Sequence, residues 1–395
     1  MTMTSPSGTP SSHDSSPGGI LNLVRSGVSA SRADIARSAG LAPSTVTTRV
    51  QALIRNGYLR EAGPGSSRGG RRPRQLEVNP TTGAVLGVDL GARHASFALF
   101  DMSGGLISER HLDMDIADGP KLILGWIVDE ANAMVAASDA PGQRLRGIGL
   151  GLPGPVDSPG GRLVSPSRMP GWNGIDAAAM LSELSGVPAL VDNDANLMAL
   201  GEHVRLGDEV QHVVFVKAGS SIGCGVIASG SLYHGHRGMA GDISHVSVPN
   251  APQTLCSCGR WGCLDAVAGG AAIVTSLRNA GVDVADTREV LGLAQDGHPL
   301  ATQMLREAGT RTGGVLATIV NFFNPQLLVL GGHLSEAEAF VAGLRSALYT
   351  ECLPMATDHL EITVSQTKAL GGVIGAGRMM LDYLFDASVI NESLV

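Results

Sequence analysis

The hydrophobic residues between positions 20 and 54 recur at helical spacing. Ile20 and Val24 are four positions apart, and Val46, Val50 and Leu53 repeat at intervals of four and three further along the chain. Apolar residues at these intervals share one face of a helix, so they predict amphipathic helices that pack against one another. The pattern indicates a small helical unit near the start of the chain.

Turn and cap residues separate these helices. Ser31 is followed three positions later by Asp34, which is the arrangement of a capping box at a helix start. Gly40 supplies a tight turn, Pro43 suits the first position of the next helix, and Gly57 ends that helix. The segment therefore predicts a helix, a tight turn and a second helix.

The outward face of the helix predicted after Pro43 carries short hydrogen-bonding side chains and one arginine. They are Ser44, Thr45, Thr47, Thr48 and Arg49. Side chains of this kind reach base edges and phosphates when a helix enters the major groove of DNA. An ordinary helical hairpin without a nucleic-acid partner would give the same apolar spacing.

Two short strands are predicted after Gly57, and a basic loop joins them. The loop before the strand at Leu76 to Val78 is rich in glycine and serine, and its arginines are Arg68, Arg71, Arg72 and Arg74. A basic loop between two strands is typical of the wing of a winged helix, where arginines contact phosphates or enter the minor groove. The helical hairpin, the two wing strands and the positive charge of the loop together favour DNA binding.

Charge is distributed unevenly along the chain. Residues 1–80 hold ten arginines, no lysine and four acidic residues, a net charge of +6, whereas residues 81–395 carry −14 and the whole chain −8. This asymmetry predicts a basic module that binds a polyanion, attached to an acidic body with another task.

Composition is that of a globular protein. The 395 residues are 44% hydrophobic and 16% charged, which suits two or three domains. Residues 1–17 are rich in serine, proline and glycine and are expected to form a disordered tail, and no apolar run reaches the roughly 18 residues of a membrane span. Five cysteines, an odd number and mostly clustered, do not form a secreted disulfide framework, so we expect a cytoplasmic protein.

Three of the five cysteines and a histidine lie within 19 positions of one another. Cys256, Cys258 and Cys263 have the spacing C-x-C-x4-C and follow His245, and glycines at 259 and 262 allow tight turns around an ion. Three thiolates and one imidazole complete a tetrahedral Zn²⁺ site with no open position, which predicts a structural metal. A redox pair or three buried apolar cysteines are the alternatives.

Beyond residue 84 the pattern changes to buried strands that end in glycine-rich or acidic turns. Residues 84–104 predict two strands joined by a tight glycine turn, and residues 189–202 predict a strand that runs into a helix at Asp192, Asn193 and Asp194. A carboxylate at such a junction can act as a general base toward a ligand hydroxyl, or it can simply cap the helix.

The order of these segments resembles the ROK family of repressors and sugar kinases, in particular its transcriptional-regulator branch. The similarity is carried by RGIGLGLPGPVD at 146–157, GDISH at 241–245 and CSCGRWGC at 256–263, and it extends from residue 18 onward. It implies a winged helix-turn-helix DNA-binding domain over residues 18–80. Over residues 81–395 it implies an α/β, actin-like (ribonuclease H-like), two-lobed sugar kinase fold of the ASKHA type that includes the zinc site.

The resemblance also implies which residues contact a sugar. They are Asn173, Asn193, Asp194, Asp242, His245 and Asp265. Asp242 and Asp265 stand where the family's sugar kinases carry glutamates, so their side chains are shorter by one methylene and suit an altered ligand. His245 would ligate zinc through one ring nitrogen and face the sugar with the other.

Two functions fit these residues. In the first, the chain is a sugar-responsive transcriptional repressor of carbohydrate genes. It would bind operator DNA as a homodimer or tetramer, with a sugar or sugar phosphate as its effector and no membrane partner. In the second, it is an ATP-dependent sugar kinase with Asp194 as the catalytic base and ATP and Mg²⁺ as cofactors.

The hairpin that grips the phosphates of ATP in the family's kinases decides between these functions. Asp89 and Gly91 of that pattern are present, but Ala92, Arg93 and His94 replace its Gly, Thr and Lys. Phosphoryl transfer depends almost entirely on positioning and charge stabilisation of the transferred group. The altered hairpin therefore favours the repressor.

Overall fold

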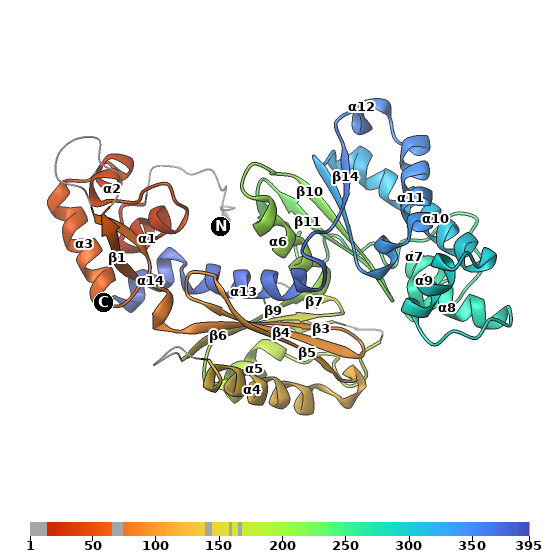
Figure 1. Ribbon diagram of the computed structural model, residues 1–395, viewed down its shortest axis with the longest axis horizontal. Helices are drawn as coiled ribbons and strands as arrows, with labels where there is room; N and C mark the ends of the chain where they lie inside the picture. Colours follow the sequence, from red (N-terminus) through yellow and green to blue (C-terminus); the bar gives the residue numbers. More distant parts are fainter. Residues whose placement is uncertain (1–13, 65–73, 139–143, 158–159, 165–167, 395) are drawn as a thin grey trace, which may run out of the picture.

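The computed structural model describes residues 14–64, 74–138, 144–157, 160–164 and 168–394 (Figure 1). The predicted tail up to residue 13 and the wing arginines Arg68, Arg71 and Arg72 lie outside the described residues. Within the described ranges, no helix is both long and apolar enough to cross a membrane.

The first described part of the chain is a winged helix, referred to below as the head. Its elements are α1 (Pro17–Arg25), α2 (Arg32–Ala39), α3 (Pro43–Arg55), β1 (Leu59–Pro64) and β2 (Arg74–Val78). The Ser31 hydroxyl accepts a hydrogen bond from the Asp34 N–H at the start of α2, and Gly40 ends α2 in the left-handed region at φ 63°. The strands β1 and β2 pair antiparallel. The predicted helices, the turn between them and the wing strands are thereby confirmed.

The first lobe of the body is a five-stranded sheet in the order β5-β4-β3-β6-β9. Its strands are β3 (Ala84–Leu90), β4 (His94–Asp101), β5 (Leu106–Asp113), β6 (Leu145–Leu152) and β9 (Ala189–Asn193). Helices α4 (Pro120–Ala136) and α5 (Ala177–Ser185) cover one face of the sheet (Figure 1). As predicted, β3 and β4 form an antiparallel hairpin.

The second lobe is another five-stranded sheet, in the order β12-β11-β10-β13-β14. Its strands are β10 (Val213–Ala218), β11 (Ile222–Ala228), β12 (Ser231–Leu232), β13 (Leu327–Gly331) and β14 (Glu361–Val364). Its helices are α7 (Leu264–Ala268), α8 (Gly270–Asn279), α9 (Thr287–Gln295), α10 (Pro299–Phe323), α11 (Glu338–Glu351) and α12 (Pro354–Thr357). Each lobe has its own apolar core.

Short elements complete the described part of the body. They are the strands β7 (Val156–Asp157) and β8 (Arg162–Leu163) and the 3₁₀ turns η1 (Pro80–Thr82), η2 (Ile116–Asp118), η3 (His333–Glu336) and η4 (Lys368–Leu370). The turn η1 lies at the predicted boundary between head and body and leads directly into β3.

Two helices, α6 (Asp194–Leu206) and α13 (Gly371–Leu384), lie together between the sheets of the two lobes (Figure 1). They approach so closely that a Cβ atom on Gly375 would lie 1.9 Å from the Leu197 carbonyl oxygen. A Cβ on Gly201 of α6 would likewise lie 2.0 Å from the carbonyl oxygen of Gly371. Only glycine fits at these positions, which fixes the lateral position of α13 against α6.

The head shares an apolar core with the C-terminal end of the body. Ile20 and Leu21 of α1 belong to one buried cluster with Phe385 and with Ile390 of the last helix, α14 (Ala387–Ser393). Polar contacts accompany this core: Gly18 N–H donates to Asn391 Oδ1 at 3.0 Å, and the Tyr58 and Ser393 hydroxyls lie 2.8 Å apart. The head is therefore packed onto the body through the end of the chain.

An ion pair joins α1 to α13 at the same contact. Arg25 Nη2 lies 2.5 Å from Asp382 Oδ1, and the Arg25 guanidinium lies 5.1 Å from the centre of the Phe385 ring. The opposite end of α13 reaches the interior of the body, where a Cβ on Gly372 would meet the Asp89 carboxylate. One 14-residue helix thus runs from the space between the lobes to the head.

Candidate functional site

The predicted metal ligands come together in the fold. One ligand atom from each of His245, Cys256, Cys258 and Cys263 lies within 4.8 Å of all the others. Cys256 Sγ is 3.5 Å from His245 Nδ1, and the Sγ atoms of Cys258 and Cys263 are 3.6 Å apart. All five cysteines of the chain are free, so the structure contains no disulfide within the cluster. The donor set of three sulfurs and one nitrogen fits a tetrahedral zinc ion.

Backbone turns bring these ligands together. Gly259 and Gly262 adopt left-handed φ values of 84° and 68° between the second and third cysteines. Cys256 N–H donates to the Arg260 carbonyl at 2.8 Å, which closes the turn on itself. The glycines that the sequence suggested as turn residues therefore do occupy conformations that other residues rarely adopt.

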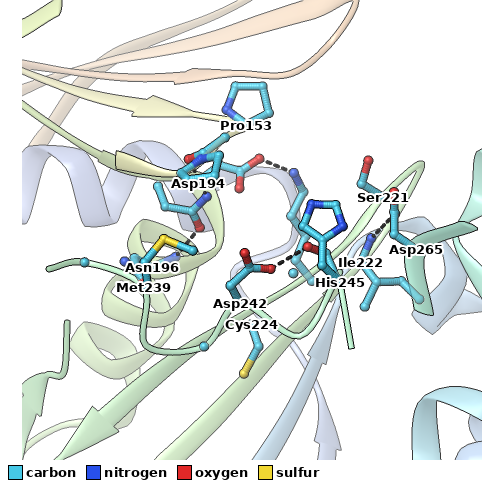
Figure 2. Close-up of a pocket in the computed structure, with 18 of the residues that line it drawn as sticks. Pro153, Asp194, Asn196, Ser221, Ile222, Cys224, Met239, Asp242, His245 and Asp265 are labelled. Carbon is cyan, nitrogen blue, oxygen red and sulfur yellow. Dashed lines mark hydrogen bonds and ion pairs between the residues drawn. The ribbon is translucent and has the colours of Figure 1, made fainter. Parts of the chain in front are cut away.

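A pocket lies between the lobes, beside this cluster (Figure 2). Its wall includes five of the six residues predicted to contact a sugar, namely Asn193, Asp194, Asp242, His245 and Asp265. Figure 2 shows Asp194 and Asp242 on opposite sides of the space, with His245 and Asp265 toward one end. His245 belongs both to the pocket wall and to the cysteine cluster, as the predicted double role requires.

Of the two asparagines predicted to contact a sugar, only Asn193 lines this pocket. Asn173 is exposed and does not line this pocket. Asn193 does line it, but its Oδ1 caps α6 by accepting from Ala195 N–H and Asn196 N–H, and its Nδ2 donates to the Gly154 carbonyl at 3.0 Å. The amide of Asn193 is thus engaged with the backbone, so its predicted sugar contact stays a prediction.

Asp194 is held by a lysine that the sequence analysis missed. Asp194 Oδ1 accepts from the Ala195 N–H at 2.7 Å, and its Oδ2 forms an ion pair with Lys217 Nζ. Burial lowers the pKa of Lys217, but attraction by Asp194 and by Asp89 outweighs burial, and the pKa lies above its usual value. A lysine at the end of the otherwise apolar strand β10 was the available sequence signal.

Asp265 is held by an arginine that was also missed. Arg168 Nη2 donates to Asp265 Oδ2 at 2.6 Å, and Arg168 Nη1 donates to Ser221 Oγ at 2.8 Å. The other carboxylate oxygen of Asp265 accepts from Ile222 N–H at 3.0 Å. Arg168 directly precedes Met169, which belongs to the core of the first lobe, whereas Asp265 lies in α7 of the second lobe, so this contact bridges the two lobes.

In the hairpin that grips the phosphates of ATP in the family's kinases, the His94 ring of this chain occupies the space over Gly91. A Cβ on Gly91 would lie 2.3 Å from Cε1 of His94, so the imidazole covers the glycine backbone. Burial lowers the pKa of His94 to about 4, and the ring is therefore neutral at pH 7. Asp89 Oδ1 is buried without a hydrogen-bond partner in the described part of the chain, and burial raises the pKa of Asp89 to about 7.

The predicted DNA-contacting face of α3 is largely open. Ser44, Thr47 and Thr48 are exposed and Thr45 is half-buried. Arg49 differs from the prediction of an outward side chain: it is half-buried, and its Nη1 is shielded from solvent with no hydrogen-bond partner among the described residues. Arg49 lies three positions after Val46 and one before Val50, both buried, so the helical period places it at the edge of the buried face of α3.

Fold and site together define a winged helix joined to a two-lobed body with the architecture of sugar kinases. The family model "ROK family" matches residues 85–382, and the model "Winged helix-turn-helix DNA-binding" matches residues 15–60. The chain belongs to the ROK family. The predicted family and fold class are thereby confirmed.

Relatives and solved structures agree with this assignment. The chain is 28% identical over 360 residues to the xylose repressor of Bacillus spizizenii, covering 90% of this chain and 92% of that protein. It is 28% identical over 371 residues to the DNA-binding transcriptional dual regulator NagC of Escherichia coli, covering 89% of each.

Among solved structures, a ROK family transcriptional regulator described as a homologue of E. coli MLC protein superposes with a TM-score of 0.79. It shares 24% identity and covers 96% of this chain and 98% of that one, so it supports the fold. The ROK hexokinase of Thermus thermophilus superposes with a TM-score of 0.62 at 29% identity, covering 75% of this chain and 97% of that one. The head is thus part of the likeness to the regulator, whereas the hexokinase likeness covers about three quarters of the chain.

Proposed function

We propose that the chain is a sugar-responsive transcriptional repressor that acts on operator DNA in the cytoplasm. The observation that carries this proposal is the pairing of a winged helix with a pocket lined by Asp194, Asp242 and Asp265. The full-length relatives named as a xylose repressor and as NagC support a sugar as the effector. In symmetric repressors two heads read two half-sites, so we expect a homodimer on a roughly palindromic operator.

DNA recognition is assigned to α3 and the wing. Ser44, Thr47 and Thr48 present hydroxyls on the exposed face of α3, where they can reach base edges in the major groove. Thr47 and Thr48 also donate to the carbonyls of Pro43 and Ser44, which holds these side chains close to the helix. Arg68, Arg71 and Arg72 of the wing would contribute phosphate contacts and the dependence of affinity on salt.

Replacing Arg71 and Arg72 together with alanine is expected to weaken operator binding and flatten its salt dependence. Each lost phosphate contact lowers the slope of log affinity against log salt by about 1, so the double variant should lose about 2. The measurement is a fluorescence-anisotropy titration at several salt concentrations with a DNA fragment from upstream of the protein's own gene. Arg162→Ala with Arg306→Ala, two exposed arginines of the body, is the matched control. An unchanged slope in the wing variant would remove the wing from the DNA contact.

The sugar signal would pass to the head along α13. This helix begins beside Asp89, whose pKa is influenced by Asp194 and Lys217 of the sugar pocket, and it ends at the ion pair of Asp382 with Arg25. A sugar shifts DNA binding only if it binds two arrangements of the lobes with different affinity. A change in lobe spacing would then move α13 and, with it, the head.

Zinc is assigned to the cluster of His245, Cys256, Cys258 and Cys263 as a structural ion. All four positions would be filled by protein ligands, so the ion supplies no open coordination site for chemistry. It would fix the orientation of His245, whose ring also faces the sugar pocket. The metal would therefore support the pocket and take no part in a reaction.

The observations weigh against the ATP-dependent sugar kinase. His94 covers Gly91 in the phosphate hairpin, and Lys217 holds the carboxylate that would act as the base. On incubation with ATP, Mg²⁺ and a panel of hexoses and amino sugars, the purified chain is expected to release no ADP above the rate without sugar. A coupled ADP assay measures this, with a ROK glucokinase as the positive control. Turnover at about 1 per second or faster, the ordinary range for kinases, would restore the kinase assignment.

A further inference from the structure

The charged groups of the sugar pocket are arranged as two ion pairs and one single carboxylate. Arg168 pairs with Asp265 at 2.6 Å, and Lys217 pairs with Asp194. The third carboxylate, Asp242, is exposed and accepts from the Ser244 hydroxyl. Two cations and three carboxylates therefore line the described wall, and a zinc ion with three thiolates nearby would add a further negative charge.

In the first pair the cation is the more exposed partner. The Arg168 side chain is 42% exposed, whereas the Asp265 side chain is 5% exposed. Asp265 is one methylene shorter than the glutamate expected from the family pattern, and its Oδ2 is engaged by the guanidinium. This edge of the pocket therefore offers hydrogen-bond donors where a carboxylate would offer only acceptors.

In the second pair both the cation, Lys217, and the carboxylate, Asp194, line the pocket. Lys217 is 22% exposed in its side chain, and its ammonium has two donors beyond the one directed at Asp194. The pocket wall therefore carries both kinds of group: Arg168 and Lys217 are donors, and Asp194 and Asp242 are acceptors. A sugar hydroxyl both donates and accepts, so it can satisfy a wall of this kind without changing its charge balance.

We propose that the excess of carboxylates over cations makes the pocket selective for an uncharged, unphosphorylated sugar. Arg168, which neutralises one of the carboxylates, sets how strong this preference is and is in this sense a specificity-determining residue. The inference rests on the proposed function of the pocket as the effector site. A phosphate or carboxylate on the sugar could reach the remaining donors of Arg168 and Lys217, but it would also lie among three carboxylates whose charge exceeds that of the two cations. Repulsion by the uncompensated carboxylate lowers the affinity for an anion. A neutral sugar does not meet this repulsion.

The test compares neutral sugars with their charged counterparts on the zinc-loaded, full-length chain. Isothermal titration measures the Kd of D-xylose, D-glucose and N-acetyl-D-glucosamine, of the 5- or 6-phosphate of each, and of D-glucuronate. The neutral member of at least one pair is expected to bind about tenfold tighter than its charged member.

Two variants of the same ion pair should move this preference in opposite directions. Arg168→Ala removes a positive charge and should widen the preference for the neutral sugar, whereas Asp265→Asn removes a negative charge and should narrow it by about tenfold. Loss of folding alone would lower all affinities together and would not give opposite shifts. Asp157→Asn breaks the exposed pair with Arg237, 2.8 Å apart and outside the pocket wall, and is the matched control.

Three results separate the two proposals. If a phosphorylated or acidic sugar binds wild-type protein more tightly than its neutral counterpart, the inference about charge is overturned and the sugar-responsive function remains. If neutral sugars are preferred but Arg168→Ala and Asp265→Asn shift the preference alike or not at all, Arg168 is not a specificity determinant. If none of these sugars binds, both the inference and the proposed effector site fail.

Discussion

Replacing Cys258 with serine is expected to remove the metal and the response to sugar together. Cys258 supplies one of four ligand atoms that lie within 4.8 Å of one another, and a serine hydroxyl is a poor substitute for a thiolate. Without the ion the turn at Gly259 and Gly262 loses its central contact, and His245 loses its fixed orientation at the pocket. Loss of a structural metal is among the most destabilising changes, on the order of 4 kcal/mol.

Three measurements check this result. Elemental analysis gives the zinc content of the purified variant, denaturant unfolding gives its stability, and an operator titration with and without sugar gives the response. Cys352→Ser is the matched control, because Cys352 lies outside the cluster and its Sγ lies 3.7 Å from the Ala317 carbonyl. Full zinc occupancy in Cys258→Ser would contradict the ligand assignment.

Replacing Phe385 with alanine is expected to separate DNA binding from sugar sensing. The Phe385 side chain is 2% exposed, belongs to the core shared by head and body, and lies beneath the Arg25 guanidinium. Truncating a buried phenylalanine typically costs about 3–5 kcal/mol, and here that loss falls on the contact between the head and α13. The head should then undock before the body unfolds, so that sugar no longer changes the affinity for DNA.

Limited proteolysis and operator titrations distinguish this outcome from general unfolding. Cleavage between head and body should become faster, while the stabilisation of the body by sugar persists in a thermal-shift experiment. Tyr383→Ala is the control on the same helix, since Tyr383 is 41% exposed. A normal sugar response in Phe385→Ala would mean that the signal does not pass through this joint.

The head and the clustering of the three cysteines with His245 could be predicted because their information is local in the sequence. The capping pair of Ser31 and Asp34 and the left-handed Gly40 depend on neighbours within a few positions. The three cysteines fall within eight positions, and the turn residues between them are glycines. Patterns of this kind depend on residues that are close in the sequence, so their spacing, together with the resemblance to the family at residues 256–263, was sufficient.

The pocket was predicted only in part because its charge balance depends on distant partners. Arg168 and Asp265 are 97 positions apart and come from different lobes, and nothing near either residue indicates the other. Asn193 shows a different difficulty, because its local pattern fits two roles. An asparagine at the end of a strand can cap the following helix or contact a sugar, and the sequence does not distinguish the two. The core shared by head and body was missed for a similar reason, since Gly18 and Asn391 are 373 positions apart.

The contact between α1 and α14 has a consequence for how the protein is made. The ribosome synthesises the head first and the last helix at the end. The apolar contact of Ile20 and Leu21 with Phe385 and Ile390 can therefore form only when translation is nearly complete. A chain that stopped short of α14 would carry a head with an uncovered apolar face. Products terminated before α14 would lack part of the contact that joins the head to the body, so we expect their operator binding to respond less to sugar than that of the finished chain.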